Sequence, residues 1–166
     1  MTYAIKLAAP LLLATLTSAQ VAQAGSATGT MNVSGNVQGS CTVSAVALNF
    51  GSITPGSATD AEGSIGAACT TGTTYTITID GGSSLVDTNR RLAEAESENY
   101  LEYIIAFDES RAVDSYIPAN CALVSNAIAE SSETVNYSVY GRVLADENSA
   151  GVVCTYSDTL GITVTY

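Results

Sequence analysis

Four cysteines are the residues of this chain with the clearest chemistry: Cys41, Cys69, Cys121 and Cys154. Zinc sites favour cysteines that are paired closely in the sequence, whereas these four are widely spaced. An even number of cysteines in an exported chain is typical of disulfide bonds. Four cysteines allow three pairings, and the residues alone do not choose between them.

The chain contains no histidine, which excludes several kinds of catalytic and metal site. Ser-His-Asp and Cys-His catalysis both need an imidazole, as does every His-ligated metal site. A G-x-S-x-G motif and a recognisable pair of catalytic carboxylates are also absent from the sequence. The sequence therefore gives an enzyme little support, although a glycosidase would need only two carboxylates.

Acidic residues dominate the charge, with 16 Asp and Glu against 5 Lys and Arg. So few cations could not neutralise the phosphates of a nucleic acid, and the acidic balance disfavours an anionic membrane. Glu94, Glu96 and Glu98 lie in an acidic cluster over residues 94–102. Their spacing fits no known calcium loop, so we expect a solvated loop or hairpin tip there and no bound metal.

The N-terminal 24 residues have the three parts of a secretory signal peptide. Lys6 is the positive residue, residues 7–16 are apolar, and Ala22-Gln23-Ala24 is an A-x-A cleavage site. The apolar run is too short to span a bilayer, which disfavours a membrane anchor. The mature chain is expected to begin at Gly25.

Short stretches of alternating residues follow, and the composition is rich in Thr, Ser, Gly, Val and Tyr, which predicts an all-β chain. Strands are expected at 41–50, 64–70, 74–80, 90–92, 99–108, 116–124, 133–143 and 156–166, with a loop over 51–63. The apolar register shifts within 41–50, which predicts a bulge or a strand that changes sheets. Expected inward faces are Tyr75, Ile77, Ile79; Leu101, Tyr103, Ile105, Phe107; and Val135, Tyr137, Val139. About six main strands at this spacing indicate an immunoglobulin-like sandwich.

Residues 27–38 alternate strictly between apolar or glycine positions and uncharged polar positions. This pattern predicts a strand with one buried face. The strand has two interpretations: it is the first strand of its own domain, or it leaves the domain and adds to the open sheet edge of a neighbour.

The last stretch, 156–166, also alternates and places Leu160, Ile162, Val164 and Tyr166 on one face. A six-stranded sandwich exposes a groove beside its last strand. Long apolar edges of that kind aggregate unless they are covered, and an alternating segment without proline is a suitable cover.

Several segments resemble, in order, the spore coat protein U domain family and, within it, the major pilins of archaic (Csu-type) chaperone–usher pili. They cover almost the whole mature chain. The segments are T-G-T-M-N-V-S-G-N-V-Q-G-S-C-T-V (28–43), L-N-F-G (48–51), T-I-D-G-G (78–82), R-R-L (90–92), Y-G-R-V (140–143) and Y-S-D-T-L-G-I-T-V-T-Y (156–166).

The resemblance implies an incomplete immunoglobulin-like β-sandwich over residues 39–166 that lacks its last strand and is completed by donor-strand exchange. In that family a periplasmic chaperone lends a strand, and an outer-membrane usher exchanges it for the N-terminal segment of the next identical subunit. The implied function is a structural pilin, without cofactor, in an extracellular pilus for adhesion and biofilm formation. A surface-coat or matrix protein of the same fold and a secreted carbohydrate-binding domain are the alternatives.

The resemblance also implies roles for particular residues. Residues 25–38 would hold the donor strand, and the terminal strand would line the acceptor groove. The family's first disulfide would join Cys41 to Cys69, which leaves Cys121 and Cys154, two cysteines that depart from the family pattern, as a second pair. The donor residues would be Thr28, Met31, Val33, Gly35 and Val37, and the groove residues Leu160, Ile162, Val164 and Tyr166.

Overall fold

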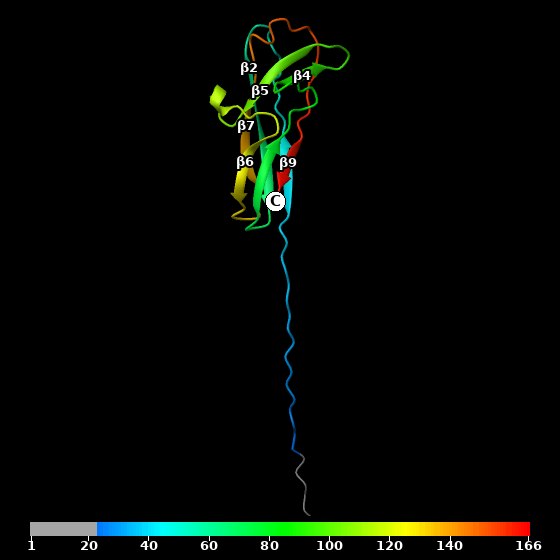
Figure 1. The fold of residues 1–166 in the computed structure, drawn as a ribbon, viewed down its shortest axis with the longest axis vertical. Coiled ribbons are helices and arrows are strands. Elements are labelled where there is room, and N and C mark those ends of the chain that lie inside the picture. Colours follow the sequence, from blue (N-terminus) through cyan, green and yellow to red (C-terminus); the bar gives the residue numbers. More distant parts are fainter. Residues whose placement is uncertain (1–22) are drawn as a thin grey trace, which may run out of the picture. The chain divides into compact units, whose positions relative to one another are not determined.

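The computed structural model describes residues 23–166, and the predicted all-β, immunoglobulin-like class is confirmed (Figure 1). Residues 36–166 form one compact unit, the domain, and residues 23–35 belong to a separate unit. No helix or strand is assigned to residues 23–40. The predicted signal peptide, residues 1–24, lies almost entirely outside the described residues. Within them, no helix has the length and apolar character to cross a membrane.

Nine strands and one short 3-10 helix make up the domain. In chain order they are β1 (Cys41–Val46), β2 (Thr59–Cys69), β3 (Thr74–Ile79), β4 (Arg90–Glu94), β5 (Tyr100–Ala106), η1 (Val113–Ser115), β6 (Cys121–Ile128), β7 (Val135–Val143), β8 (Tyr156–Ser157) and β9 (Ile162–Thr165).

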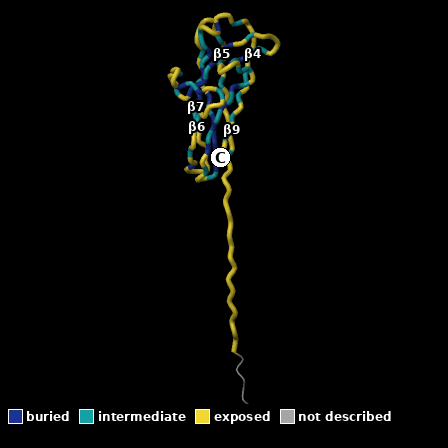
Figure 2. The backbone as a smooth tube through the Cα atoms, viewed as in Figure 1, coloured by how far each residue is buried: buried dark blue, intermediate teal, exposed yellow. Residues whose placement is uncertain are grey.

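The strands form two antiparallel sheets that enclose one core. The larger sheet has the order β1-β2-β7-β5-β4-β8, and the smaller has the order β6-β3-β9. Buried residues from both sheets meet between them, where Figure 2 shows the darkest segments. They include Ile65, Ile77, Ile79, Leu92, Leu101, Tyr103, Ile105, Val139 and Val143. Alternation along β2, β3, β5 and β7 supplies most of this core, as expected for a sandwich.

The predicted strand 41–50 is shorter in the structure, and neither the expected bulge nor a change of sheet occurs. β1 pairs with β2 in a regular register and ends at Val46, after which the chain bends inward. A Cβ at Gly63 would lie 2.6 Å from the Val46 carbonyl oxygen, and one at Gly141 would lie 2.9 Å from the Phe50 ring. These two glycines let residues 47–50 pass close over β2 and β7. Leu48 and Phe50 thereby pack against the core.

The bounds of β2, β5 and β6 also differ from the prediction. β2 begins at Thr59, inside the predicted loop 51–63, because residues 59–63 pair with the end of β7. β6 covers 121–128 instead of 116–124. Phe107, predicted to point inward, lies beyond the end of β5 and is 56% exposed.

The predicted final strand 156–166 is two separate strands. β8 pairs with β4 in the larger sheet, and β9 pairs with β3 in the smaller one. The chain changes sheets over residues 158–161, where a Cβ at Gly161 would meet the Asp80 carboxylate. Any other residue at this position would have to displace that side chain, which directly follows β3.

Candidate binding groove

An apolar groove opens between two edge strands, β1 of the larger sheet and β9 of the smaller. Its cavity measures about 280 Å³. One wall comes from residues 45–48 and Phe50, the other from Leu160 and Ile162. The cavity also reaches five core residues, Ile65, Ile79, Leu92, Tyr103 and Val139. The groove therefore lies directly beside the buried core, and its exposed lining comes from the two edges.

The β1 wall has inward-pointing side chains that nothing in the domain covers. Directly opposed residues in an antiparallel pair lie on the same face of the sheet. Val43 is opposite Ala67 and Ala45 is opposite Ile65, and both partners are buried. Val43 nevertheless stays 45% exposed. Sequence analysis missed this wall, although the alternation of Cys41, Val43 and Ala45 signals it.

The β9 wall contains the terminal residues that the sequence singled out. Ile162 is opposite Ile79, and Val164 is opposite Ile77, so both point toward the core. Both remain half-buried, as does Leu160. Tyr166 lies past the end of β9 and is 60% exposed.

A second cavity of about 620 Å³, the distal cavity, continues from the groove. The two share Leu48, Phe50, Leu92 and Asp158. Loop residues 48–55 and 151–158 line most of it. Among the residues lining either cavity, Asp158 is the single charged one.

The Asp158 carboxylate is held in place by several donors. The Tyr103 hydroxyl donates to it at 2.6 Å, and the backbone N–H groups of Ser83 and Thr159 donate at 2.7 and 2.8 Å. Burial, together with this hydrogen bond, raises the pKa of Tyr103 far above its usual range. Asp158 therefore fixes the crossing segment between β8 and β9.

Arg90 begins β4, directly opposite Tyr103 on β5, and is 3% exposed. Its guanidinium donates to the carbonyl oxygens of Asp80, Ile117 and Pro118 at 2.5–3.2 Å. Burial lowers the pKa of Arg90 from its usual value. Arg90 therefore ties β3 and β4 to the segment before β6, which is a structural role.

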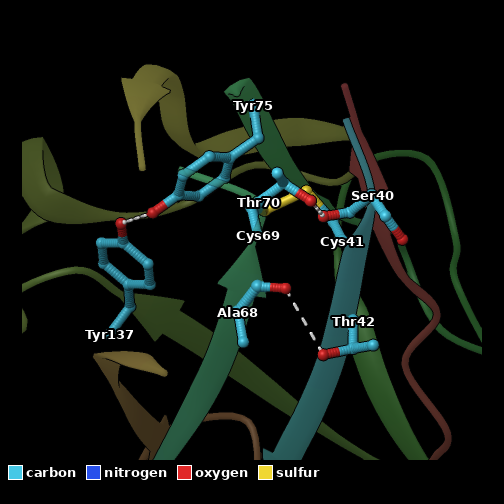
Figure 3. The surroundings of a disulfide bond; sticks show 8 residues. All are labelled: Ser40, Cys41, Thr42, Ala68, Cys69, Thr70, Tyr75 and Tyr137. Carbon is cyan, nitrogen blue, oxygen red and sulfur yellow. Dashed lines mark hydrogen bonds between the residues drawn. A yellow bond between two sulfur atoms is a disulfide. The ribbon is translucent and has the colours of Figure 1, made fainter. Parts of the chain in front are cut away.

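A disulfide joins Cys41 to Cys69 at the first residue pair of the β1–β2 ladder, as expected (Figure 3). Beside it, the Tyr75 and Tyr137 hydroxyls share a hydrogen bond of 2.6 Å. Burial and this hydrogen bond raise the pKa of Tyr137 to about 12. The end of the domain that carries this disulfide is called the base below.

The expected second disulfide is not formed, because Cys121 and Cys154 both have free, exposed thiols. Cys121 begins β6, an edge strand of the smaller sheet. Cys154 lies in the loop before β8, which is an edge strand of the larger sheet. Cys121 thus lies in the smaller sheet and Cys154 in a loop that leads to the larger one, a placement that the sequence spacing does not reveal.

Residues 25–38, the predicted donor segment, are exposed throughout (Figure 2). Met31, Val33 and Val37 are 87%, 87% and 84% exposed. Thr28 and Gly35 are exposed as well. Such apolar side chains on one face of an unpaired segment need a partner surface to bury them.

The acidic cluster is a solvated hairpin end between β4 and β5, and Glu96 and Glu98 are exposed. Over residues 23–166, no group of three or more acidic, cysteine or histidine side chains is arranged to hold a metal ion.

Residues 27–163 match the Spore Coat Protein U domain. The chain belongs to this family. Protein U of Myxococcus xanthus is 29% identical to this chain over 170 residues, and the alignment covers 92% of each of the two chains.

A solved structure shares the fold of this spore coat protein U domain. It is the crystal structure of the CsuC–CsuE chaperone–tip adhesion subunit pre-assembly complex from archaic chaperone–usher Csu pili of Acinetobacter baumannii. The match has a TM-score of 0.58 and 23% identity over 78% of this chain. This chain spans only 40% of the matched one.

Proposed function

We propose that this protein is a structural subunit that polymerises head-to-tail by donor-strand complementation. Residues 25–38 of one copy enter the groove between β1 and β9 of the next copy. The observation that carries the proposal is the groove itself, in which inward-facing residues of two edge strands remain uncovered directly beside the core.

The edges of the two sheets favour this groove as the site of strand addition. Four strands lie at sheet edges: β1, β8, β6 and β9. β8 has two residues, and β6 has register irregularities against β3 with Asn126 at a φ of 52°. Short and irregular edges resist the addition of another strand. β1 and β9 are the regular edges that remain, and both border the groove.

The donor segment fits an apolar groove in both pattern and charge. Its alternate residues include Met31, Val33 and Val37, and none of residues 25–38 is charged. Burying each of these three side chains is worth roughly 1.5–3 kcal/mol. The contact uses different surfaces on the two copies and leaves a free groove at one end, so it builds a filament and not a closed ring.

The assembly route is the one that the resemblance implies, and the solved chaperone–subunit complex of the same fold supports its first step. A periplasmic chaperone covers it after export, and an outer-membrane usher replaces the chaperone with the donor segment of an identical subunit. The product is an extracellular pilus that serves adhesion and biofilm formation. Strand exchange and polymerisation account for the proposed role, which requires no catalysis.

A coat or matrix protein of the same fold is the second candidate function. The match to the Spore Coat Protein U domain and the similarity to Protein U along nearly the whole chain favour it. Donor-strand complementation would serve either assembly. Electron microscopy separates the two, because a pilin forms thin filaments and a coat protein forms layers without filaments.

Replacement of Val33 tests the donor assignment. Val33→Asp places a carboxylate in the apolar groove, where an unpaired charge is strongly disfavoured, so the variant should stay unassembled. Ser34→Asp is the matched control, since its side chain would lie on the opposite face of the donor strand and remain in water. Filaments of Val33→Asp at wild-type yield would refute the donor assignment.

A further inference from the structure

The distal cavity is a large hollow that the donor strand alone does not explain. We propose that it is a second contact surface between neighbouring subunits, and that it receives the base of the copy whose donor strand fills the groove. This inference rests on the proposed function and adds a body-to-body contact to it.

The two ends of the domain are fixed by the register of β2. Cys69 ends β2 at the base, while Thr59 pairs with Val143 at the other end, called the distal end. Eleven strand residues separate these ends by about 35 Å. The loops that line the distal cavity precede β2 and follow β7, so the cavity is at the distal end.

Only one direction of the donor strand produces a continuing filament. If the strand ran from the distal end toward the base, the donating body would collide with the acceptor's base, from which the acceptor's own donor segment must leave. A strand that runs from base to distal end avoids this collision. It is parallel to β1 and antiparallel to β9, and it ends at the distal cavity.

The linker between the donor and the domain is too short to keep the two bodies apart. From Val37 to Cys41 the chain spans at most about 14 Å, because an extended chain advances roughly 3.5 Å per residue. A copy whose Val37 occupies the distal part of the groove therefore has its Cys41–Cys69 disulfide next to the acceptor's distal cavity.

The surfaces that would meet are uncharged or apolar over the parts that carry the proposal. At the base, residues 36–40 and 70–73 carry no charge, and the Thr70 N–H donates to the Ser40 carbonyl at 2.8 Å. Glu130 and Glu133 lie beside them in the loop between β6 and β7, where the Gly72 N–H donates to the Ala129 carbonyl at 2.8 Å. The distal cavity has one carboxylate, that of Asp158, and an apolar rim that includes Val152 and Val153, 50% and 102% exposed. We therefore place the contact on the uncharged part of the base and on this apolar rim.

The two free thiols provide a native probe of this contact. Cys154 lines the distal cavity, whereas Cys121 is on β6, which β3 separates from β9 and the groove. Labelling with N-ethylmaleimide would be compared between wild-type filaments and the unassembled, full-length Val33→Asp subunit. We expect the labelling rate of Cys154 to fall by at least about tenfold on assembly, because a covered thiol reacts only when the contact opens transiently. The labelling rate of Cys121 should stay nearly unchanged.

Cross-linking shows which surface covers Cys154. In a Cys121→Ser background, Thr71→Cys at the base should form covalent subunit ladders with Cys154 when filaments are treated with a short bismaleimide. Adding Cys154→Ser should abolish the ladder, and Ser110→Cys in place of Thr71→Cys should give none. The distance of about 35 Å between the ends prevents the same link within one copy.

The outcomes separate the two proposals. Filaments in which Cys154 is labelled as fast as in the unassembled subunit, or in which Thr71→Cys gives no more ladder than Ser110→Cys, would overturn this inference alone. A wild-type chain that forms no strand-exchanged assembly would overturn the proposed function and this inference with it.

Discussion

Cys41 lies directly opposite Cys69, and their disulfide closes the β1–β2 ladder at the point where the N-terminal segment joins the domain. β1 is an edge strand of the larger sheet and also a wall of the groove. The disulfide therefore fixes one wall of the groove to the core strand β2. In a filament it would also be the first covalent link that carries tension from the donor segment into the domain.

Loss of this disulfide should destabilise the subunit strongly. The bond closes a loop with a sequence separation of 28, and restricting the unfolded chain in this way is worth roughly 3–4 kcal/mol. Denaturant unfolding of Cys41→Ser/Cys69→Ser against the intact domain measures the loss. Cys121→Ser/Cys154→Ser is the control, because it removes two thiols and no bond, and it should unfold near the wild-type midpoint. Equal midpoints for all three would contradict the prediction.

A synthetic peptide of residues 25–38 should stabilise the unassembled Val33→Asp subunit in trans. A ligand that binds only the folded state raises the free energy of unfolding by about 2.7 kcal/mol at one hundred times its dissociation constant. Thermal unfolding monitored by circular dichroism would show a midpoint that rises with peptide concentration. A peptide with Val33→Asp is the control, and a similar rise with that peptide would argue against insertion into the groove.

The Asp60–Arg142 pair should make stability depend on acid pH. Arg142 donates to both carboxylate oxygens of Asp60, at 2.6 and 2.8 Å, and this lowers the pKa of Asp60 below its usual 3.8. The unfolded chain then binds the proton first as pH falls. The stabilisation is complete above the unfolded pKa and disappears as pH falls through the folded one.

The size of this effect is small because the pair is partly exposed. Asp60→Asn should cost about 0.5–1 kcal/mol of unfolding free energy at neutral pH, and the difference from wild type should shrink below pH 3.8. Urea unfolding at several pH values measures it. Glu98→Gln, at the exposed hairpin end, should match the wild type. A pH-independent difference for Asp60→Asn would show that the pair does not act through its charge.

Tyr137 should titrate late and make the domain sensitive to alkali. Its pKa is raised to about 12, chiefly by burial and also by the hydrogen bond with Tyr75. Since the fold favours the neutral phenol, its stabilisation is present below the ordinary pKa of 10 and is lost as pH rises toward 12. An ultraviolet titration should show a component near pH 12 that is missing in Tyr137→Phe, whereas Tyr103, whose pKa is raised further, stays protonated there.

The same substitution should also lower stability at neutral pH. Tyr75 is 3% exposed, so removing the Tyr137 hydroxyl leaves a buried hydroxyl without its partner, at a cost of about 1–3 kcal/mol. Tyr140→Phe is the matched control, because it keeps the ring over which Arg111 lies. Equal losses in the two variants would contradict a specific role for the Tyr75–Tyr137 bond.

The sequence by itself determined the fold class and the strands whose patterns are local. Tyr75, Ile77 and Ile79 were predicted to point inward, and all three are buried in β3. Period-two alternation is a property of a single strand, so it can be recognised without knowing which strands lie beside it. The resemblance likewise led to the family and to the Cys41–Cys69 pairing, both of which are confirmed.

The tertiary structure decided where strands begin, end and change sheets. Gly63, in the first half of β2, is a residue that is common in loops, and it contributed to the loop prediction. The structure needs a glycine there because residues 46–48 pass directly over it. The final segment divides between two sheets because residues 158–161 cross from β8 to β9. Neither event leaves a periodic signal, since both depend on contacts between segments that are distant in the chain.

The second wall of the groove and the free thiols likewise required the structure. Val43 and Ala45 occupy alternate positions, as the inward residues of any core strand do. Only their position on β1, an edge strand that no neighbour covers, makes them a candidate binding surface. Cys121 and Cys154 were expected to pair because they remain after the disulfide that the resemblance implies, but the fold places Cys121 on β6 and Cys154 in the loop before β8, with both thiols free. Pattern determines which face of a strand is apolar, whereas the packing of all the strands determines which apolar face is left for a partner.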